Sequence, residues 1–257
     1  MTSHPKIDYV LFDMDGLMID SERVYTEVTN EILAPYGAFM TWDIKSGLMG
    51  KPERDAVEHL LSFFPNIPIT VDEYIVQRTT LQDLHWPTVQ LLPGVARLIK
   101  HLHAHNVPMA IATGSQRRNF VQKSSHLQEI FGLFGERVTC GDDPWLKAEG
   151  GKGKPAPDVF LVAARSIGRP VGEKGPLGEL EGDAVREKET EERKRGLVFE
   201  DALAGARAAK RAGMNVVWVP DPELLTVDSK DEITPDQTLR SLEDFVPEEW
   251  GLPPYDG

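Results

Sequence analysis

Cysteine and long apolar runs, which mark disulfide-bonded and membrane proteins, are scarce in this sequence. Cys140 is the only cysteine among 257 residues, so an intramolecular disulfide is excluded and a reducing compartment is expected. No apolar run approaches the length that spans a membrane, and the first six residues hold no apolar core of a secretory signal. We therefore expect a cytoplasmic protein with no membrane partner.

Clustered positive charge is also lacking. The formal net charge is −13, and Lys and Arg do not gather into a basic stretch of the kind that binds a phosphate backbone. We therefore expect no nucleic-acid partner. Apolar residues make up 40% of the chain and charged residues 27%, which is ordinary for a globular protein large enough to carry an insert. We expect a monomer that acts on a small molecule.

The sequence does contain an alternation of short apolar strands and amphipathic helices. Such alternation is typical of a doubly wound, mostly parallel α/β sheet of the Rossmann-like type. Apolar runs predict strands at residues 9–12, 107–112, 138–139, 197–199 and 216–219. Apolar residues at helical spacing predict helices around residues 95–102, up to 124, at 157–167 and at 202–212.

Residues 20–90 interrupt this alternation with helical patterns alone. Within them, Thr70 and Glu73 have the spacing of a capping box at a helix start. We therefore expect an α/β core made of residues 1–19 and 91–257, with an all-helical cap domain inserted directly after the first strand.

Residues 173–195 form a second insertion, within the core. They carry eight acidic and six basic side chains among 23 residues, and few apolar ones. Such a segment buries too little apolar surface to offset its ordering entropy. We expect a solvated insertion that hangs outward, with a frayed helix near residues 184–194.

Carboxylates follow the first predicted strand. Asp13 and Asp15 stand two residues apart at its end, and Gly16 lets the chain turn sharply. Burying unpaired carboxylates is costly, and a divalent cation such as Mg²⁺ is a usual remedy that leaves room for a phosphate. A strand followed by a polar Asx turn accounts for the pair equally well.

Residues suited to binding a phosphate follow in two further places. Thr113 and Gly114 come directly after the second strand, where a hydroxyl and backbone amides at a helix entrance can hold a phosphate oxygen. A plain helix cap has the same sequence pattern. Lys154 lies between a glycine and a proline just before a helix, which favours a cation held in a fixed place. The alternatives are that Lys154 is an ordinary exposed lysine, or that Lys152 is the fixed cation instead.

Two more acids, Glu200 and Asp201, end the strand at residues 197–199. Ligands of open parallel sheets collect at the carboxyl ends of the strands, so we expect these acids beside Asp13. Two like unit charges about 4 Å apart repel by about 4 kcal/mol at an effective dielectric of 20. A phosphate that approaches Asp13 meets the same repulsion, which the positive charges of a divalent cation and Lys154 could outweigh.

Together these motifs resemble those of the haloacid dehalogenase-like phosphatases. The resemblance rests on Asp13-Met14-Asp15-Gly16, Thr113, Lys154 and Glu200-Asp201, with a helical insert after the first motif. It extends from Tyr9 to Tyr255, apart from the charged insertion. It implies a Mg²⁺-dependent phosphomonoesterase in which Asp13 is a nucleophile that forms an aspartyl-phosphate. Asp15 would protonate the leaving alcohol and then activate water.

The resemblance also implies roles for the remaining residues. The phosphoryl group would be bound by Thr113, Gly114 and Lys154. Mg²⁺ would be bound by the Asp13 carboxylate, the Asp15 main-chain carbonyl and Asp201, with Glu200 as an outer or alternate ligand. From the cap, the substrate would be contacted by Gly50 and Lys51.

Within the family, the chain resembles phosphatases of pseudouridine 5′-phosphate, so that ester of nucleotide metabolism is the expected substrate. The segments that carry this narrower resemblance are residues 12–23, 42–45, 49–51, 141–144, 244–248 and 251–253. The alternatives are a phosphatase of sugar phosphates or other nucleoside monophosphates, a β-phosphoglucomutase-like phosphomutase, which shares all four motifs, and a binding module on a degraded hydrolase fold. The intact pair Asp13 and Asp15 argues against the last.

Four remaining residues are expected to be structural. His101, His103 and His105 lie in one predicted helix, and residues two apart on a helix point to different faces. We therefore expect surface histidines that do not converge on one metal ion. Cys140 is expected to be a small buried residue.

Overall fold

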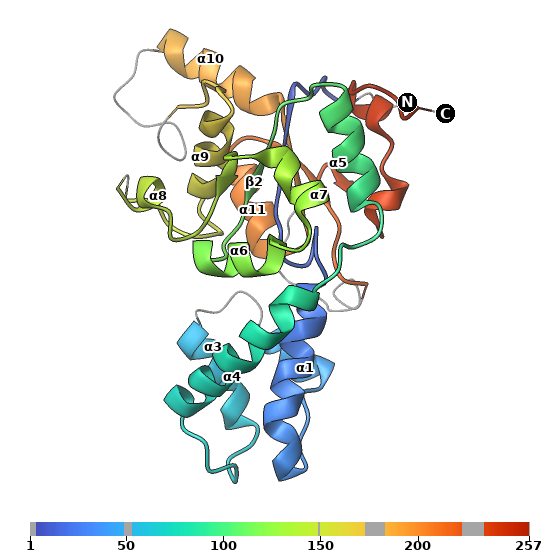
Figure 1. The fold of residues 1–257 in the computed structure, drawn as a ribbon. Coiled ribbons are helices and arrows are strands. Elements are labelled where there is room, and N and C mark those ends of the chain that lie inside the picture. The colour runs from blue at the N-terminus through green and yellow to red at the C-terminus, as the bar shows by residue number, and fades with distance from the viewer. Residues whose placement is uncertain (1–3, 49–52, 149, 173–182, 223–233, 257) are drawn as a thin grey trace. The chain divides into compact units, whose positions relative to one another are not determined.

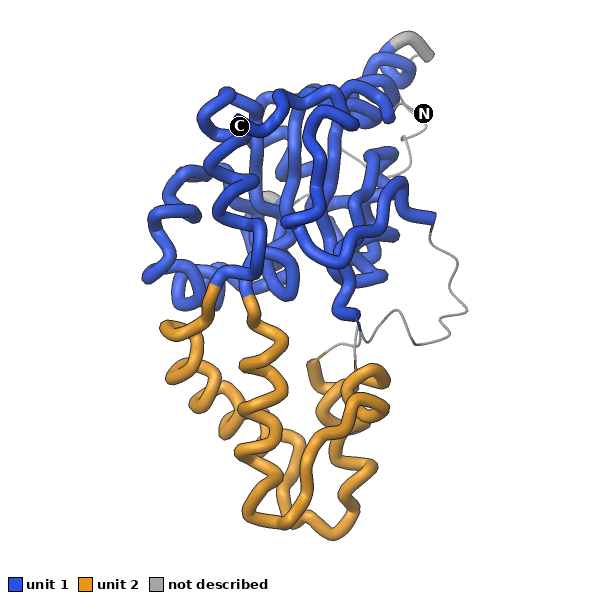
Figure 2. The backbone as a smooth tube through the Cα atoms, turned by 90° about the vertical axis from the view of Figure 1, so that its right-hand side faces the viewer, with its two compact units in different colours: residues 1–19, 91–257 blue, residues 20–90 orange. Residues whose placement is uncertain are grey.

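The computed structural model describes residues 4–48, 53–148, 150–172, 183–222 and 234–256 (Figure 1). The chain divides into two compact units, which Figure 2 shows in different colours. Unit 1 combines Met1–Ile19 with Leu91–Gly257, and unit 2 is Asp20–Gln90. Gly50 and Lys51, the predicted cap contacts to substrate, lie outside the described residues.

Unit 1 is built on a six-stranded sheet whose paired strands all run parallel. The strands are β1 (Tyr9–Phe12), β2 (Met109–Ala112), β3 (Val138–Thr139), β4 (Gly196–Glu200), β5 (Asn215–Trp218) and β6 (Gln237–Thr238), in the order β3-β2-β1-β4-β5-β6. The strand order reverses between β1 and β4, which is where open α/β sheets bind ligands. The predicted doubly wound parallel sheet is confirmed, with β6 as an addition that the apolar pattern does not predict.

Helices surround this sheet (Figure 1). Those described in unit 1 are α5 (Val95–Ala104), α6 (Arg117–Ser124), α7 (Gln128–Phe131), α8 (Pro144–Ala148), α9 (Asp158–Ser166), α10 (Asp183–Lys194) and α11 (Leu203–Arg211), with the 3₁₀ turns η3 (Gly132–Phe134), η5 (Leu242–Asp244) and η6 (Pro247–Trp250). Among the described helices of the chain, none combines the length and the apolar character needed to cross a membrane.

The central strands are buried on both faces, in keeping with their nearly continuous apolar sequences. Successive side chains of a strand point to opposite faces of the sheet. On one face, Leu11 and Val198 pack in a core cluster with residues of α9 and α11. Phe12, the next residue along from Leu11, stacks on Phe199 and meets Phe134 of η3 edge-on. These two cores hold the ends of β1 and β4 in place.

The elements described in unit 2 are helices. They are α1 (Ser21–Leu33), η1 (Ala34–Tyr36), α2 (Trp42–Leu48), α3 (Glu53–Ser62), α4 (Val71–His85) and η2 (Trp86–Thr88). The predicted capping box of α4 is confirmed, because Thr70 Oγ1 accepts from the Glu73 N–H at 3.2 Å and the Glu73 carboxylate accepts from the Thr70 N–H at 2.8 Å. The hydroxyls of Tyr74 and Thr29 share a buried hydrogen bond of 3.0 Å, which joins α4 to α1.

The charged insertion falls partly outside the described residues, since 173–182 are not among them. Its remainder contains α10, which agrees with the helix predicted near residues 184–194. The last turn of α10 departs from the solvated insertion that the composition predicts. Arg193 is 3% exposed and donates to the carbonyl oxygen of Val171 at 2.7 Å, and Glu192 accepts from Arg169. Composition alone misses these contacts because they join the helix to a loop that is not its neighbour in sequence.

Candidate active site

Asp13 is positioned by β1 and by its neighbour β4. It follows β1 directly, and its backbone N–H donates to the carbonyl oxygen of Phe199 at 3.0 Å, which continues the pairing of the two strands. The residue is 6% exposed. Gly16 then adopts a left-handed φ of 79°, which a residue with a Cβ adopts only with strain, and the chain leaves the sheet. The structure thus places Asp13 at the switch point of the sheet.

Lys154 connects two of the predicted acids. Its ammonium group, from the loop before α9, donates to Asp13 Oδ1 and to Glu200 Oε1, the latter at 2.6 Å. The Lys154 side chain is 12% exposed, so water screens these charges little. Lys154 is therefore a fixed cation, whereas Lys152 is exposed.

Glu200 and Asp201 stand at the end of β4 and are both buried. Glu200 is 1% exposed, and its Oε2 accepts from the backbone N–H of Ala202 at 2.9 Å. The main-chain carbonyl of Asp201 accepts from the indole N–H of Trp218 at 2.7 Å. Gly205 leaves the space that the Glu200 carboxylate fills, because a Cβ at this position would overlap Oε1. The start of α11 thus holds Glu200 toward Lys154.

Three of these acids could share one metal ion. Asp13, Glu200 and Asp201 each offer a carboxylate oxygen, and these oxygens lie within 4.8 Å of one another in buried surroundings. Hard oxygen ligands of this kind suit Mg²⁺ or Ca²⁺ better than softer metals. Lys154 supplies one positive charge against three carboxylates, so the donor set fits a divalent cation.

The charges of the site shift the pKa values of its groups. Burial raises the pKa of Asp13 to about 7 against the opposing charge of Lys154, and the carboxylates of Glu200 and Asp15 add to the rise. Burial lowers the pKa of Lys154, but Asp13 and Glu200 raise it by more, so Lys154 stays charged. A divalent cation beside Asp13 would favour the ionised carboxylate instead.

Thr113 and Gly114 follow β2, the strand next to β1. Thr113 is fully buried, and its Oγ1 accepts from the Ser115 N–H at 3.0 Å. Gly114 is exposed, with open space where a Cβ would point. Among the described residues, no hydrogen bond joins Thr113 to Asp13 or to Lys154. The structure therefore puts Thr113 and Gly114 at the end of the strand next to β1, with no hydrogen bond, in the described part of the chain, from Thr113 to the group formed by Asp13 and Lys154.

Lys123 is a residue of this region that the sequence pattern does not predict. Its ammonium group is fully buried and donates to Asp15 Oδ1 at 2.6 Å and to Ser115 Oγ at 3.1 Å. Ser115 Oγ donates in turn to Asp15 Oδ2 at 2.6 Å. Both carboxylate oxygens of Asp15 are thus held. The pattern of α6 gives no sign of this, because its apolar Val121 is 53% exposed while Lys123 points inward.

Arg117 is a second such residue, and it orders the loop after β3. Its backbone N–H donates to Asp142 at 2.7 Å, and its guanidinium group donates twice to the carboxylate of Asp143. The same loop carries Gly141, where a Cβ would lie 2.5 Å from the carbonyl oxygen of Gly114. The segment at residues 141–144 therefore packs against the loop that holds the predicted phosphate-binding residues.

Comparison with known proteins adds to this geometry. The family model of haloacid dehalogenase-like hydrolases matches residues 7–213. The chain is 43% identical over 255 residues to (DL)-glycerol-3-phosphatase 2 of Arabidopsis thaliana, covering 97% of this chain and 93% of that protein. It is 38% identical over 250 residues to a Drosophila melanogaster protein named "Probable pseudouridine-5′-phosphatase", covering 97% and 96%. A HAD-family hydrolase from Deinococcus radiodurans R1, crystallised with phosphate and sodium, shares the fold with a TM-score of 0.70 at 23% identity, covering 96% of this chain and 98% of that one.

These matches confirm the resemblance that the motifs indicate. The family model spans most of the chain, and the two phosphatase relatives span nearly all of it. The chain belongs to the haloacid dehalogenase-like hydrolases and is a phosphoric monoester hydrolase.

Proposed function

We propose that the chain is a Mg²⁺-dependent phosphomonoesterase that forms an aspartyl-phosphate on Asp13. The observation that carries the proposal is the buried contact of Lys154 with Asp13 and Glu200, beside Asp201. This arrangement combines a nucleophilic carboxylate, a cation for the phosphate and oxygen ligands for a metal at one point of the sheet. Phosphoryl transfer needs mainly such positioning and charge neutralisation.

In the first half-reaction, a carboxylate oxygen of Asp13 bonds to phosphorus while the bond from phosphorus to the substrate oxygen breaks. The leaving oxygen takes a proton from Asp15. Lys154 holds the transferring group by its charge. Thr113 holds it through the hydroxyl proton, because its oxygen has already accepted the Ser115 N–H. The open surface at Gly114 lets the main chain approach the phosphate.

In the second half-reaction, ionised Asp15 takes a proton from water, and the oxygen of that water attacks phosphorus. The bond from phosphorus to Asp13 breaks, and inorganic phosphate leaves. Asp15 recovers in this step the proton that it gave up in the first, so the enzyme is unchanged after one cycle. Lys123 and Ser115 keep the Asp15 carboxylate in place throughout.

The proposed metal ligands are the carboxylates of Asp13 and Asp201 and the main-chain carbonyl of Asp15, with Glu200 as an outer or alternate ligand. When bound, Mg²⁺ neutralises charge between Asp13 and the phosphate oxygens. The support is the set of buried carboxylate oxygens within 4.8 Å of one another.

Unit 2 is proposed as the cap domain that selects the leaving group, with Gly50 and Lys51 as its contacts to substrate. The support is its place in the chain, because this compact helical unit begins at Asp20, directly after the turn that carries Asp15. Variation in such a unit can change the substrate without altering the phosphoryl chemistry at Asp13.

The proposed substrate is pseudouridine 5′-phosphate. Its support is the resemblance of segments such as residues 12–23 and 141–144 to phosphatases of that ester, and the identity of 38% to the Drosophila protein. Glycerol 3-phosphate is the second candidate, because the identity to the Arabidopsis glycerol-3-phosphatase is 43%. Both are small phosphate monoesters that the same residues would hydrolyse. A phosphomutase would instead need a bisphosphate activator and would release little phosphate.

Phosphate release in the presence of Mg²⁺ tests the proposal. The substrates are pseudouridine 5′-phosphate, glycerol 3-phosphate, uridine 5′-phosphate and a panel of sugar phosphates. We expect Asp13→Asn to abolish release and Asp244→Asn, at an exposed acid in η5, to retain it. The substrate with the highest kcat/KM identifies the leaving group. Full release by Asp13→Asn would contradict the mechanism, and isomerisation of a sugar phosphate with little free phosphate would favour the mutase.

A further inference from the structure

Helix α5 and the residue that caps its C-terminal end carry a histidine pair outside the proposed active site. His101 and His105 lie four residues apart and share one face of the helix, with ring centroids 4.4 Å apart. The prediction of three surface histidines is wrong for His101, which is 7% exposed, whereas His103 is exposed as expected. Residues two apart on a helix point to different faces, but residues four apart, such as His101 and His105, share a face.

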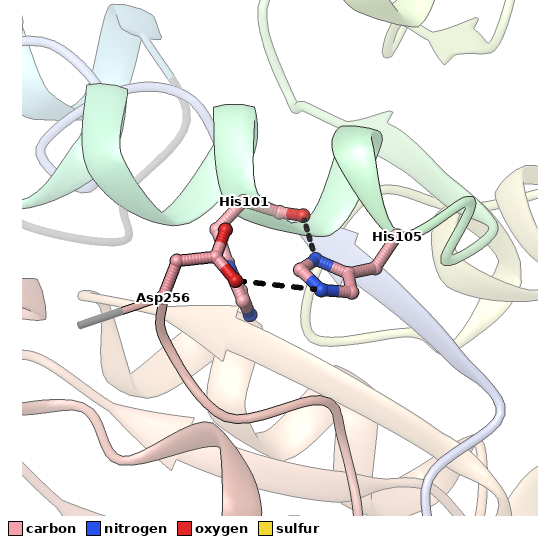
Figure 3. Close-up of side chains that lie close together, drawn as sticks. All are labelled: His101, His105 and Asp256. Carbon is pink, nitrogen blue, oxygen red and sulfur yellow. Dashed lines mark hydrogen bonds and ion pairs between the residues drawn. The ribbon is translucent and has the colours of Figure 1, made fainter.

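Asp256 completes a cluster with this pair. One nitrogen of each ring and one carboxylate oxygen of Asp256 lie within 4.8 Å of one another. His105 Nε2 is 4.0 Å from Asp256 Oδ1, and Figure 3 shows the carboxylate turned toward the His105 ring and beside the His101 ring. A separation of 4.0 Å is too long for a hydrogen bond. The two imidazole rings and the carboxylate therefore face one another, and no hydrogen bond joins these three described side chains.

Backbone carbonyls orient both rings. His101 Nε2 is 2.9 Å from the carbonyl oxygen of Pro253, and His105 Nδ1 is 3.0 Å from that of His101. A carbonyl oxygen only accepts, so each of these nitrogens carries a proton. In the neutral rings, the lone pairs are then on His101 Nδ1 and His105 Nε2. A hydrogen bond from the other ring nitrogen to a carbonyl is the usual outer contact of a metal-binding histidine.

We propose that His101, His105 and Asp256 bind a divalent transition-metal ion of the Zn²⁺ type. Two neutral imidazoles and a carboxylate are a donor set that Zn²⁺ accepts, with water in the fourth position. Tetrahedral ligands about 2.1 Å from the ion are about 3.4 Å from one another, so the cluster would contract slightly on binding. The Asp256 side chain is 86% exposed and free of packing that would oppose this movement.

The ion would join two segments that are distant in sequence. Residues 253–256 already touch α5, through the bond of His101 to Pro253 and through Tyr255, whose ring lies against His101 and under the guanidinium group of Arg97. The bound ion would fasten this segment to α5. The imidazole nitrogens of this site also give it a different metal preference from the carboxylates around Asp13, because imidazole suits Zn²⁺ and oxygen alone suits Mg²⁺.

Zn²⁺ titration calorimetry in excess Mg²⁺ tests the proposal, because Mg²⁺ fills oxygen sites and competes poorly for imidazole. Loss of an outer contact lowers the affinity of a metal site by about 10- to 100-fold, so we expect His105→Ala to weaken Zn²⁺ binding by about 100-fold or more. Asp256→Asn replaces a charged direct ligand by a neutral one and should weaken it by about tenfold or more. His103→Ala is the matched control on the same helix and should bind Zn²⁺ as the wild type does.

Co²⁺ supplies a second readout, because it absorbs visible light strongly when four ligands that include nitrogen surround it. This absorption should appear in the wild type, in His103→Ala and in Asp13→Asn, and should be absent from His105→Ala. Phosphate release with Mg²⁺ should be unchanged in His105→Ala. Equal Zn²⁺ affinity in His105→Ala and the wild type, or Co²⁺ absorption that disappears in Asp13→Asn, would overturn the proposal.

Discussion

The buried ammonium group of Lys123 lies 2.6 Å from Oδ1 of Asp15, the residue proposed to move protons in both half-reactions. Lys123 comes from α6 and Asp15 from the turn after β1, so the contact joins segments 108 residues apart. A cation at this distance favours the ionised carboxylate. Ser115 bonds to both groups and completes a triangle that fixes the orientation of Asp15.

Replacing Lys123 with Met keeps most of the side-chain volume and removes the charge. We expect kcat for phosphate release to fall by about 10- to 100-fold with little change in KM, because Asp15 loses the group that positions it for proton transfer. Asp15 acts first as an acid and then as a base, so the parts of the pH–rate profile that depend on it should also move to higher pH when its ionised carboxylate loses the cation. A pH–rate profile of the variant and the wild type measures both effects.

Two further variants control for this result. Lys100→Met removes an exposed lysine that pairs with Glu129, and it should have the kinetics of the wild type. Lys123→Arg keeps the charge and should recover part of the lost rate. A Lys123→Met enzyme that is less stable but unchanged in kcat and pH profile would show that Lys123 acts on folding alone.

Gly205 offers a test of the position of Glu200. In Gly205→Ala the new methyl group would overlap the Glu200 carboxylate, which is buried and held by Lys154 and by Ala202. We expect a loss of stability of about 1–3 kcal/mol from overpacking, together with weaker Mg²⁺ activation of phosphate release. Urea unfolding and a Mg²⁺ titration of activity measure the two effects. Gly132→Ala, where the nearest atom is 3.7 Å from the new Cβ, should change neither.

The raised pKa of Asp13 predicts how the metal-free protein responds to pH. The pKa rises from 3.8 to about 7, so the folded state binds this proton more tightly than the unfolded state does. The resulting stability is fully present below about pH 4 and is lost as the pH rises through about 7. Asp13→Asn has no such proton, so its stability relative to the wild type should rise by on the order of 2 kcal/mol between pH 5 and pH 8.

Urea unfolding with a chelator at the two pH values checks this expectation. Excess Mg²⁺ at pH 8 should shrink the difference, because the cation stabilises the ionised carboxylate of the wild type and not the amide of the variant. A difference between Asp13→Asn and the wild type that does not depend on pH would contradict the pKa shift.

Cys140 is buried, as predicted, and burial raises the pKa of its thiol to about 12. The thiolate is the reactive form, so almost none of it is present at pH 8. We expect the native protein not to react with Ellman's reagent at pH 8. In denaturant, the protein should release one equivalent of the reagent's coloured thiolate at once. Rapid reaction without denaturant would mean that the segment after β3 opens readily.

Much of the proposed site could be predicted because its residues follow strands. Apolar runs predict the strands of a parallel sheet, and the carboxyl ends of parallel strands meet at one edge. Asp13 and Glu200 follow from that rule, and the structure brings both into contact with Lys154. Lys154 lies outside a strand, but its position between glycine and proline before a helix marks it as a fixed group. The local pattern was sufficient here because each signal spans only a few residues.

Short-range pattern also accounts for the parallel sheet and the capping box of α4, since both depend on residues close together in the chain. The inward turn of Lys123 and His101 follows no local pattern. A polar side chain is buried only where a partner meets it, because an unpaired buried polar group is costly. Asp15 meets Lys123, and Pro253 meets His101, only after distant parts of the chain have packed together. For these side chains, the long-range fold alone supplies the partner.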